Sequence, residues 1–295
     1  AIILIPTFLW SVGLVSHIDP LMYRVIWWAL GHSSQQINVA AHITIWYMVA
    51  GLLFGAKPMS EKVSRTAFLL YILFLQLASA HHILVDPGVS STWKVFNTSY
   101  AMYLAVLASL IGFGFIGGIS GVVMGVEQIN LIIHNTIYVP GHFHATVVLG
   151  TTMAFMSATY FLLPTLFGRE IFMFKLAKLQ PYLFGLGMAG FSVFMMGAGT
   201  MGVARRHWDM AFTGAPYAFE YPAIAYTLMG LTGIFAAMAI IGGALFCVIA
   251  VGTLLFGKKV DSKVGFMGFR GADSYTTDRP PLLERAPADT VSHKD

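Results

Sequence analysis

Long apolar stretches separated by short polar loops dominate the chain. The stretches lie at about residues 1–16, 25–55, 66–83, 94–111, 112–131, 138–167, 181–203 and 223–256. Several of them approach or exceed the roughly 20 residues with which a helix crosses a bilayer. Turn-forming pairs such as Asp19-Pro20, Lys57-Pro58 and Pro87-Gly88 stand in the loops. The pattern predicts an all-α fold, a polytopic transmembrane helix bundle with about eight spans.

Composition agrees with a protein embedded in lipid. The chain is 57% apolar and only 10% charged, whereas soluble domains carry about 25% charged residues. The net charge of +4 says little about partners, because membrane loops carry positive residues for topology. We therefore expect a lipid bilayer, and no nucleic acid, around this chain. The single Cys247 lies in an apolar run, which excludes a disulfide framework and a thiolate metal site.

Basic residues are unequally divided between the two sides of the predicted bundle. If the chain changes sides at each span, one side receives few of them: Arg24, Lys94, Arg205 and Arg206. The other side receives Lys57, Lys62, Arg65, Arg169, Lys175, Lys178, Lys258, Lys259 and Lys263. The positive-inside rule makes this second side cytoplasmic. The sequence thus predicts a multi-pass plasma (inner) membrane protein whose polar tail, residues 257–295, is cytoplasmic.

The alternation of sides requires residues 94–131 to cross the membrane twice. As one helix this segment would be about 57 Å long at 1.5 Å per residue, well beyond a hydrocarbon core of about 30 Å. The turn near Ile111-Gly112 contains no polar residue, so we expect that sequence is missing there. The chain also begins at Ala1 inside an apolar run, and we expect its true N-terminus to be missing. Residues 1–256 are then the transmembrane domain.

His142 and His144 are the most informative residues. They stand in the run His-Asn-Thr-Ile-Tyr-Val-Pro-Gly-His-Phe-His at residues 134–144, where a long apolar stretch begins. Helical residues two apart point about 200° apart, since each residue turns roughly 100°. The two imidazoles cannot share one metal, but they can hold two metals on opposite sides of one helix. Imidazole is a common axial ligand of haem iron, and ionisable residues inside a membrane usually mark function. The pair favours two haems and electron transfer.

A second group of histidines comprises His32 and the pair His81-His82. His32 lies early in the 25–55 stretch, and the pair closes the 66–83 stretch. Adjacent helical residues converge on one ion only where the helix is ending, and here it ends within a few residues. Three neutral imidazoles without a nearby carboxylate or thiolate suit copper, zinc or iron. The alternative is that each histidine is a satisfied polar group between helices.

Arg205 and Arg206 form the third feature, on the side that carries few basic residues. One interpretation is an interfacial pair whose charges reach the lipid headgroups. The other is a guanidinium pair that binds haem propionates, since Arg binds carboxylates through two parallel hydrogen bonds. We favour the second. Asp86 and His134 lie on the same side and either join the propionate network or cap a helix end.

Together these motifs resemble subunit I of the haem–copper respiratory reductase superfamily, closest to its B-type branch. The matching stretches are Ile18-Asp19-Pro20-Leu21, Trp27 to His32, His81 to Gly88 with Thr92-Trp93-Lys94, His134 to His144, and Arg205-Arg206. The resemblance covers nearly all of residues 1–256. The chain looks like roughly the last two-thirds of such a subunit, because the early helix with the second histidine of the low-spin haem is absent.

The resemblance implies a set of cofactors and partners. His32, His81 and His82 would bind copper, His142 the high-spin haem and His144 the low-spin haem, with Arg205 and Arg206 at the propionates. We expect two haems, the low-spin one b-type and the high-spin one a- or b-type. Expected partners are a cupredoxin-like or cytochrome subunit II and cytochrome c or quinol as electron donor, in a bacterium or archaeon.

One departure from the family bears on the reaction. Oxygen reductases carry a tyrosine four residues after the first copper histidine, and that tyrosine supplies a proton and an electron when the O–O bond breaks. Here the residue is Gln36, and an amide cannot be oxidised in this way. The C-type branch takes its tyrosine six residues before the histidine pair, which is Leu75 here, with Tyr71 a full turn further away. The known nitric oxide reductases carry a glutamate four residues after the first copper histidine, so Gln36 matches neither the oxygen reductases nor these nitric oxide reductases.

A second departure concerns protons. B-type oxidases lead protons along hydroxyl side chains, and Tyr47 fits that path. Ile43, Ala108 and Ile111 stand where the family has hydroxyl residues. A broken path would suit an enzyme that needs fewer protons and does not pump.

The favoured hypothesis is the catalytic subunit of a membrane haem–copper nitric oxide reductase, which reduces NO to N2O and uses Gln36 to hydrogen-bond an intermediate. The alternative is an oxygen reductase of the cytochrome c oxidase type that has lost or relocated the tyrosine. A third hypothesis is a membrane transporter or structural protein whose histidines bind no haem.

Overall fold

The computed structural model describes residues 2–101, 115–206, 214 and 220–259. These residues form two compact units. Unit 1 comprises Ala1–Ile43, Pro58–Thr151 and Ala189–Gly233, and unit 2 comprises Thr44–Lys57, Thr152–Met188 and Ile234–Asp295. The junction expected near residue 111 lies outside the described residues, as does the tail beyond residue 259.

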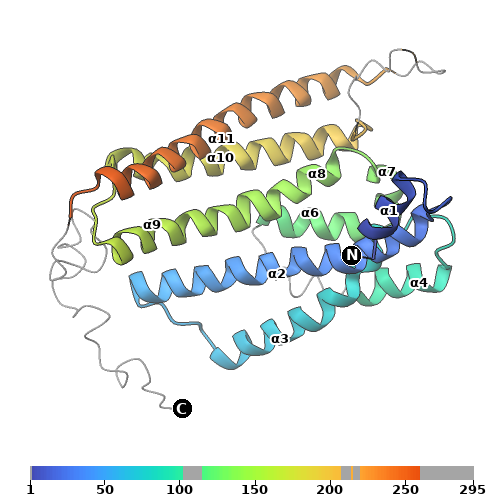
Figure 1. Ribbon diagram of the computed structural model, residues 1–295, viewed down its shortest axis with the longest axis horizontal. Coiled ribbons are helices and arrows are strands. Elements are labelled where there is room, and N and C mark those ends of the chain that lie inside the picture. Colours follow the sequence, from blue (N-terminus) through green and yellow to red (C-terminus); the bar gives the residue numbers. More distant parts are fainter. Residues whose placement is uncertain (1, 102–114, 207–213, 215–219, 260–295) are drawn as a thin grey trace. The chain divides into compact units, whose positions relative to one another are not determined.

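Helices make up nearly all of the regular structure in the described ranges (Figure 1). The α-helices are α1 (Leu4–Ser11), α2 (Pro20–Phe54), α3 (Glu61–Leu77), α4 (Ser91–Phe96), α6 (Phe115–Gly125), α7 (Glu127–Ile133), α8 (Tyr138–Phe143), α9 (Met153–Phe167), α10 (Phe174–Thr200) and α11 (Ala223–Phe256). A 3-10 helix at Ala78–His82 continues α3. Two π-helical segments, Asn97–Ala101 and His144–Thr152, follow α4 and α8.

Four of these helical stretches are long and apolar enough to cross a membrane. They are Pro20–Phe54, Tyr138–Phe167, Phe174–Thr200 and Ala223–Phe256, and the bent pair α6–α7 raises the number to five. The prediction of an all-α, polytopic membrane protein is confirmed. Many large apolar side chains are exposed, among them Leu30, Leu69 and Ile240 at 68%, 69% and 70%, as expected where lipid is the solvent.

The expectation of about eight spans differs from the structure in three described stretches. At 66–83 the chain forms α3 (Glu61–Leu77) and the 3-10 helix, and α3 is not among the candidate spans. The first stretch forms only the eight-residue α1, which ends before Gly13, and Gly13 takes a left-handed conformation that terminates a helix. The stretch at 112–131 is broken rather than straight, because Val126 is extended and the axes of α6 and α7 differ by 101°. The Asn130 side chain supports the break by donating a hydrogen bond to the Met124 carbonyl at 2.6 Å.

The first turn of α2 explains why this helix begins where it does. The Asp19 carboxylate accepts hydrogen bonds from the backbone N–H groups of Leu21 and Met22, at 2.9 and 3.2 Å. Pro20 occupies the first helical position, where its missing N–H costs nothing. An N-cap of this kind fixes the start of the helix that carries His32 between three and four turns later.

Glycines allow α8 and α10 to pack closely within unit 1. A Cβ at Gly199 would lie 2.2 Å from the Tyr138 backbone nitrogen, and one at Gly141 would lie 2.7 Å from Met196 Cγ. Both contacts are shorter than van der Waals distance, so larger residues cannot stand at either position without moving the backbone. The helix that carries His142 is therefore held firmly against α10.

Unit 2 packs α9, α10 and α11 around buried Gln180. Its amide donates to the Gly242 carbonyl at 3.1 Å, and its side-chain oxygen accepts from the Tyr160 hydroxyl at 3.2 Å. Beside Gln180 and Tyr160 lies a mainly apolar cavity of about 250 Å³ that is also lined by Trp46, Leu53, Met153, Met156, Ser157, Phe161 and Pro181.

Candidate functional site

His32 and His82 approach each other in unit 1. The Nδ1 atom of His32 lies 3.1 Å from the Nε2 atom of His82. His32 is almost completely buried in the middle of α2, at 2% exposure, and His82 stands at the end of the 3-10 helix. The indole of Trp28 stacks on the His82 ring with centroids 3.8 Å apart and planes 2° from parallel. The stacking fixes the direction in which the His82 imidazole points.

The distance between these two nitrogens suits a shared metal ion. Two imidazole nitrogens bound at about 2.0–2.1 Å to a tetrahedral ion are about 3.3 Å apart. The third predicted ligand, His81, follows from the same 3-10 helix, but its side chain is outside the described part of the chain. The assignment of His32, His81 and His82 to copper remains a prediction, and the geometry of the two described side chains fits it.

Gln36 lies one helical turn after His32 and faces it. The Gln36 Nε2 atom is 3.4 Å from the His32 Nε2 atom. The carboxamide oxygen of Gln36 accepts a hydrogen bond from the Tyr71 hydroxyl, and the same hydroxyl lies 3.4 Å from the Gln36 carbonyl oxygen. Tyr71 therefore lies at the candidate site. The sequence did not predict this, because Tyr71 stands a full turn further from the histidine pair than the position where the C-type branch has its tyrosine. Spacing along α3 alone could not reveal that its ring reaches Gln36 on α2.

His142 is oriented by a partner on α6. Its Nδ1 atom lies 3.0 Å from the Ser120 hydroxyl oxygen, and Ser120 in turn donates to the Ile116 and Gly117 carbonyls. The ring lies against Gly121, where an added Cβ would be 3.0 Å from the His142 Cε1 atom. An imidazole that hydrogen-bonds through Nδ1 keeps Nε2 for a metal, which is the usual arrangement of a metal-ligating histidine.

His144 is oriented by different neighbours. Its Nδ1–H donates to the Pro140 carbonyl at 2.7 Å, and the edge of its ring meets Phe191 of α10 with centroids 5.0 Å apart. His142 therefore has its partners on α6 and His144 on α10, in keeping with the expectation that the two rings leave the helix in different directions. Again Nε2 is the nitrogen left for a metal. Both histidines fit axial ligation of haem iron, and their haem roles remain predictions.

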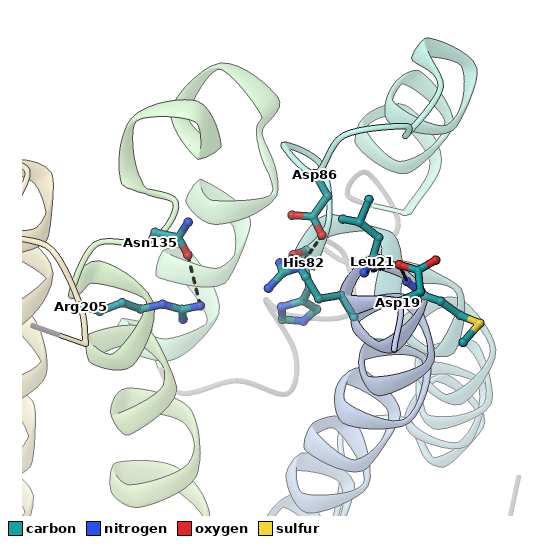
Figure 2. Close-up of polar contacts among 8 residues, drawn as sticks. Asp19, Leu21, His82, Asp86, Asn135 and Arg205 are labelled. Atoms are coloured by element: carbon teal, nitrogen blue, oxygen red, sulfur yellow. Dashed lines mark hydrogen bonds and ion pairs between the residues drawn. The ribbon is translucent and has the colours of Figure 1, made fainter. Parts of the chain in front are cut away.

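A polar network lies beside His82 (Figure 2). The Arg24 guanidinium forms an ion pair with Asp86 at 2.5 Å and donates to the His82 carbonyl at 3.2 Å. Arg24 was not predicted to belong to the site, although it stands two turns before His32 on α2. Asp86 is therefore engaged with Arg24, and Arg24 connects that carboxylate to the segment that carries a predicted metal ligand.

Arg205 reaches the same region from the segment after α10. Its backbone N–H donates to the Asn135 carbonyl at 2.9 Å, and its Nη2 atom lies 3.5 Å from the Asn135 side-chain oxygen. Figure 2 shows the Arg205 side chain extending toward the segment with His82 and Asp86. Its Nε atom is buried without a hydrogen-bond partner among the described residues. An unpartnered guanidinium nitrogen of this kind fits an anionic group such as a propionate.

Charge and burial act together on this cluster. Burial lowers the pKa of Arg205, and the neighbouring charges of Arg206 and Arg24 lower it further. Burial also lowers the pKa of His134, against the opposing effect of the Asp86 carboxylate. Three guanidinium groups near one carboxylate leave an excess of positive charge. Arg206 is exposed, and its backbone lies in the left-handed region with φ 67°. The propionate roles of Arg205, Arg206, Asp86 and His134 stay predictions.

Two further polar residues of α2, Tyr47 and His42, are not among the candidate ligands. Tyr47 belongs to unit 2 and is 43% exposed, so its role in a proton path stays a prediction. Ile43 packs against the cluster of Val39 and Tyr71, and this apolar side chain offers no hydroxyl. Ala108 and Ile111 are outside the described residues. The Nδ1 atom of buried His42 lies 3.1 Å from the Thr151 hydroxyl oxygen.

Comparison with known proteins identifies similar chains. The sequence model of the family described as "Cytochrome C and Quinol oxidase polypeptide I" matches residues 97–245. Cytochrome c oxidase subunit 1 of Thermus thermophilus is 28% identical over 275 residues, which cover 79% of this chain and 48% of that protein. A probable quinol oxidase subunit 1 of Staphylococcus haemolyticus is 24% identical, covering 79% of this chain and 37% of that protein.

A solved structure is similar as well. A chain of a heme-copper terminal oxidase dimer, determined by cryo-electron microscopy, superimposes with a TM-score of 0.72 at 26% identity. The match covers 85% of this chain and 52% of that chain. The present chain thus spans about half the length, or less, of the proteins it resembles.

Proposed function

The chain belongs to the cytochrome c and quinol oxidase polypeptide I family, and within this family we propose that it is the catalytic part of a membrane nitric oxide reductase. The family is one of haem–copper oxidoreductases, and haems and copper are the cofactors that it implies. The finer proposal is that the reaction is the reduction of NO to N2O. One observation carries it, namely that the carboxamide of Gln36 faces His32 where oxygen reductases have a phenol.

The positions of the described His32, His82, His142 and His144 side chains support their proposed roles as ligands. His32 and His82, with His81, would hold copper, while His142 and His144 would hold the high-spin and low-spin haems. Arg205 with Arg206 would bind propionates, and His134 and Asp86 would complete that network. When bound, the haem–copper pair supplies electrons and a Lewis acid. The low-spin haem would be b-type and the high-spin haem a- or b-type.

Stoichiometry explains why a carboxamide is sufficient for NO reduction. Two NO molecules, two electrons and two protons give N2O and water, so no O–O bond has to break. An amide cannot lose a hydrogen atom as a phenol does, but its N–H group donates hydrogen bonds to a polar intermediate. Gln36 would hold the reacting nitrogen and oxygen atoms beside the metal in this way. The apolar Ile43 near Tyr71 agrees with a reaction that needs few protons and no pumping.

A second candidate function is oxygen reduction, and the contact between Tyr71 and Gln36 favours it. A phenol hydroxyl is present next to the residue that replaces the usual tyrosine, although the carboxamide stands between it and His32. The related proteins are also named as oxidases. In this case Tyr71 would be a relocated tyrosine, and its loss would abolish oxygen reduction.

Partners and orientation belong to the same proposal. We expect a cupredoxin-like or cytochrome subunit II, with cytochrome c or quinol as electron donor. The protein would lie in the plasma (inner) membrane of a bacterium or archaeon with its C-terminal tail in the cytoplasm. Candidate membrane spans in the described chain support the membrane location, and the distribution of Lys and Arg supports the orientation.

Parallel turnover with NO and O2 tests the proposal. The reduced full-length enzyme, purified with its partner subunits, is supplied with each gas while N2O formation and O2 uptake are recorded. We expect rapid N2O formation and little O2 uptake. A His142→Ala variant is the matched control, because it should lose the high-spin haem and both activities. Fast O2 uptake without N2O would overturn the proposal in favour of the second candidate, and an absent Soret band would overturn both.

A further inference from the structure

Tyr71 and Gln36 form a contact between α3 and α2 at the edge of the candidate metal site. The Tyr71 Oη–H donates to the side-chain oxygen of Gln36, and Oη lies 3.4 Å from the Gln36 backbone oxygen. Both residues are buried, at 5% and 9% exposure. Val39, Ala40 and Ile43 pack around the Tyr71 ring. The hydroxyl is thus held in place by apolar neighbours, and water has little access to compete for the carboxamide.

The contact selects one orientation of the Gln36 carboxamide. A carboxamide has an acceptor oxygen at one end and a donor NH2 group at the other. The Tyr71 hydroxyl donates to the oxygen, so the NH2 group lies on the side of His32, 3.4 Å from its Nε2 atom. Because a metal on Nδ1 leaves the proton of the neutral imidazole on Nε2, the NH2 group does not donate to this ring and faces the candidate metal site instead. Turning the amide over would place an NH2 group against the donating hydroxyl. A buried polar group that loses its partner is costly, so the orientation is strongly preferred.

We propose that Tyr71 is a positioning residue of the candidate metal site, which holds the Gln36 carboxamide with its NH2 group toward His32. The role deepens the proposed function, since it rests on the metal role of His32 and on NO as the substrate. If Tyr71 were instead the relocated tyrosine of the second candidate function, Tyr71→Phe would abolish oxygen reduction and the positioning role would be overturned. No bond is made or broken and no electron is transferred at Tyr71. The residue acts only through the direction in which it holds Gln36.

The experiment uses the full-length enzyme with its partner subunits and two substitutions. Tyr71→Phe removes the hydroxyl and keeps the ring, and Gln36→Met removes the carboxamide at similar length. Tyr182→Phe is the matched control, because it makes the same chemical change on α10 at a side chain that is 68% exposed. The measurements are copper and haem content, the infrared C–O stretch of carbon monoxide added to the reduced enzyme, and turnover with NO and O2.

We expect Tyr71→Phe to retain copper and haem but to shift or split the C–O band, because the freed amide takes more than one orientation. The turnover number should fall about fivefold with an unchanged KM. A fivefold change in rate corresponds to about 1 kcal/mol, the contribution of a single hydrogen bond. Tyr182→Phe should match the wild type. In the Gln36→Met background, Tyr71→Phe should add no further change, since a residue that acts through another loses its effect when that residue is absent.

Four results would overturn all or part of this inference. An unshifted C–O band in copper-loaded Tyr71→Phe would overturn the role of Tyr71 alone, as would an equal effect of that substitution with and without Gln36. If Tyr71→Phe does not assemble, Gln36→Met carries the test, and an unshifted band there has the same meaning. A wild-type enzyme without copper would instead overturn the proposed function, and the role of Tyr71 with it.

Discussion

Arg24 joins two parts of unit 1 through a single side chain. Its guanidinium pairs with the Asp86 carboxylate and also donates to the His82 carbonyl, so one cation connects α2, the 3-10 helix and the loop after it. The Asp86 side chain is only 13% exposed and that of Arg24 30%. A charge-assisted hydrogen bond with so little exposure contributes more to stability than a pair on the surface.

Substitution of Asp86 by Asn should therefore destabilise the region around His82. We expect a loss of about 2 kcal/mol, because Arg24 keeps its charge but loses its carboxylate partner. Copper content should fall as well, since Arg24 no longer holds the backbone at His82. The thermal midpoint and the copper content of the purified enzyme measure both effects.

The chain provides a control for that substitution. Glu61 and Arg65 form an ion pair one helical turn apart, with side-chain exposures of 45% and 77%. Glu61→Gln should change stability by less than about 0.5 kcal/mol and leave copper unchanged, as is usual for exposed pairs. Equal effects of the two substitutions would contradict the role assigned to Arg24 and Asp86.

At the level of single residues, the sequence revealed ligand types but not their neighbours. The histidines were recognisable because imidazoles are unusual in apolar stretches. The contact of Tyr71 with Gln36 spans two helices and 35 positions in sequence, and Arg24 is 62 positions from Asp86. Such contacts depend on how helices pack, and neither spacing nor composition carries that information. The partner of Asp86 in its ion pair, Arg24, was not foreseen.

At the level of elements, close packing between α8 and α10 positions the helix of His142 and His144. Gly199 is the tightest point, because the nearest atoms to an added Cβ belong to the backbone of Tyr138. Backbone atoms cannot move aside as the end of a flexible side chain can. The separation of α8 and α10 is therefore set by the absence of a side chain at Gly199.

Gly199→Ala should push α8 away from α10. Overpacking of this kind costs about 1–3 kcal/mol, and here the conflict with the backbone favours the upper end. We expect a lower thermal midpoint and a weaker Soret band, since both histidines of α8 and the following segment are displaced. Gly230→Ala on α11 is the control, because nothing lies within 4 Å of its added Cβ, and alanine there favours the helix. A normal Soret band in Gly199→Ala would contradict this account.

Length and hydropathy predicted the long helices well. The stretches expected at 25–55, 138–167 and 223–256 correspond to Pro20–Phe54, Tyr138–Phe167 and Ala223–Phe256. The bend after Gly125 was not predicted, because the stretch at 112–131 was interpreted as one straight span even though the polar pair Glu127-Gln128 follows Val126. The helix expected from Pro181 begins at Phe174, since a proline inside a helix does not necessarily end it. Hydropathy reports which residues avoid water and gives little information on where a helix bends.

For the whole molecule, we predict the orientation in the membrane from the basic residues in and near the loops. Lys57 lies between α2 and α3, Lys62 and Arg65 lie in the first two turns of α3, and Arg169 and Lys175 flank the start of α10. In the described chain, Arg24, Lys94, Arg205 and Arg206 supply the opposite side. Lys94 forms an ion pair with Glu127 at 3.4 Å on that side, but the positive-inside rule counts Lys and Arg rather than net charge, so the pair does not change the predicted orientation.

Reporter fusions should confirm a cytoplasmic tail. A fluorescent protein that folds only in the cytoplasm, joined after Asp295, should fluoresce, whereas the same reporter inserted after Gly88 should not. The loop at Gly88 is a suitable control, because it lies on the side with few basic residues. The reverse pattern would contradict the orientation inferred from the basic residues.

The π-helical segment His144–Thr152 has a consequence for any exchange of parts between this chain and its relatives. A π turn is equivalent to one residue inserted into an α-helix, so side chains after it are out of phase with those before it by about 100°. Here that phase lets His142 meet Ser120 while Thr151 meets His42. A chimera joined inside this segment to a helix without the insertion would keep one of these contacts and lose the other, even if every residue type were preserved.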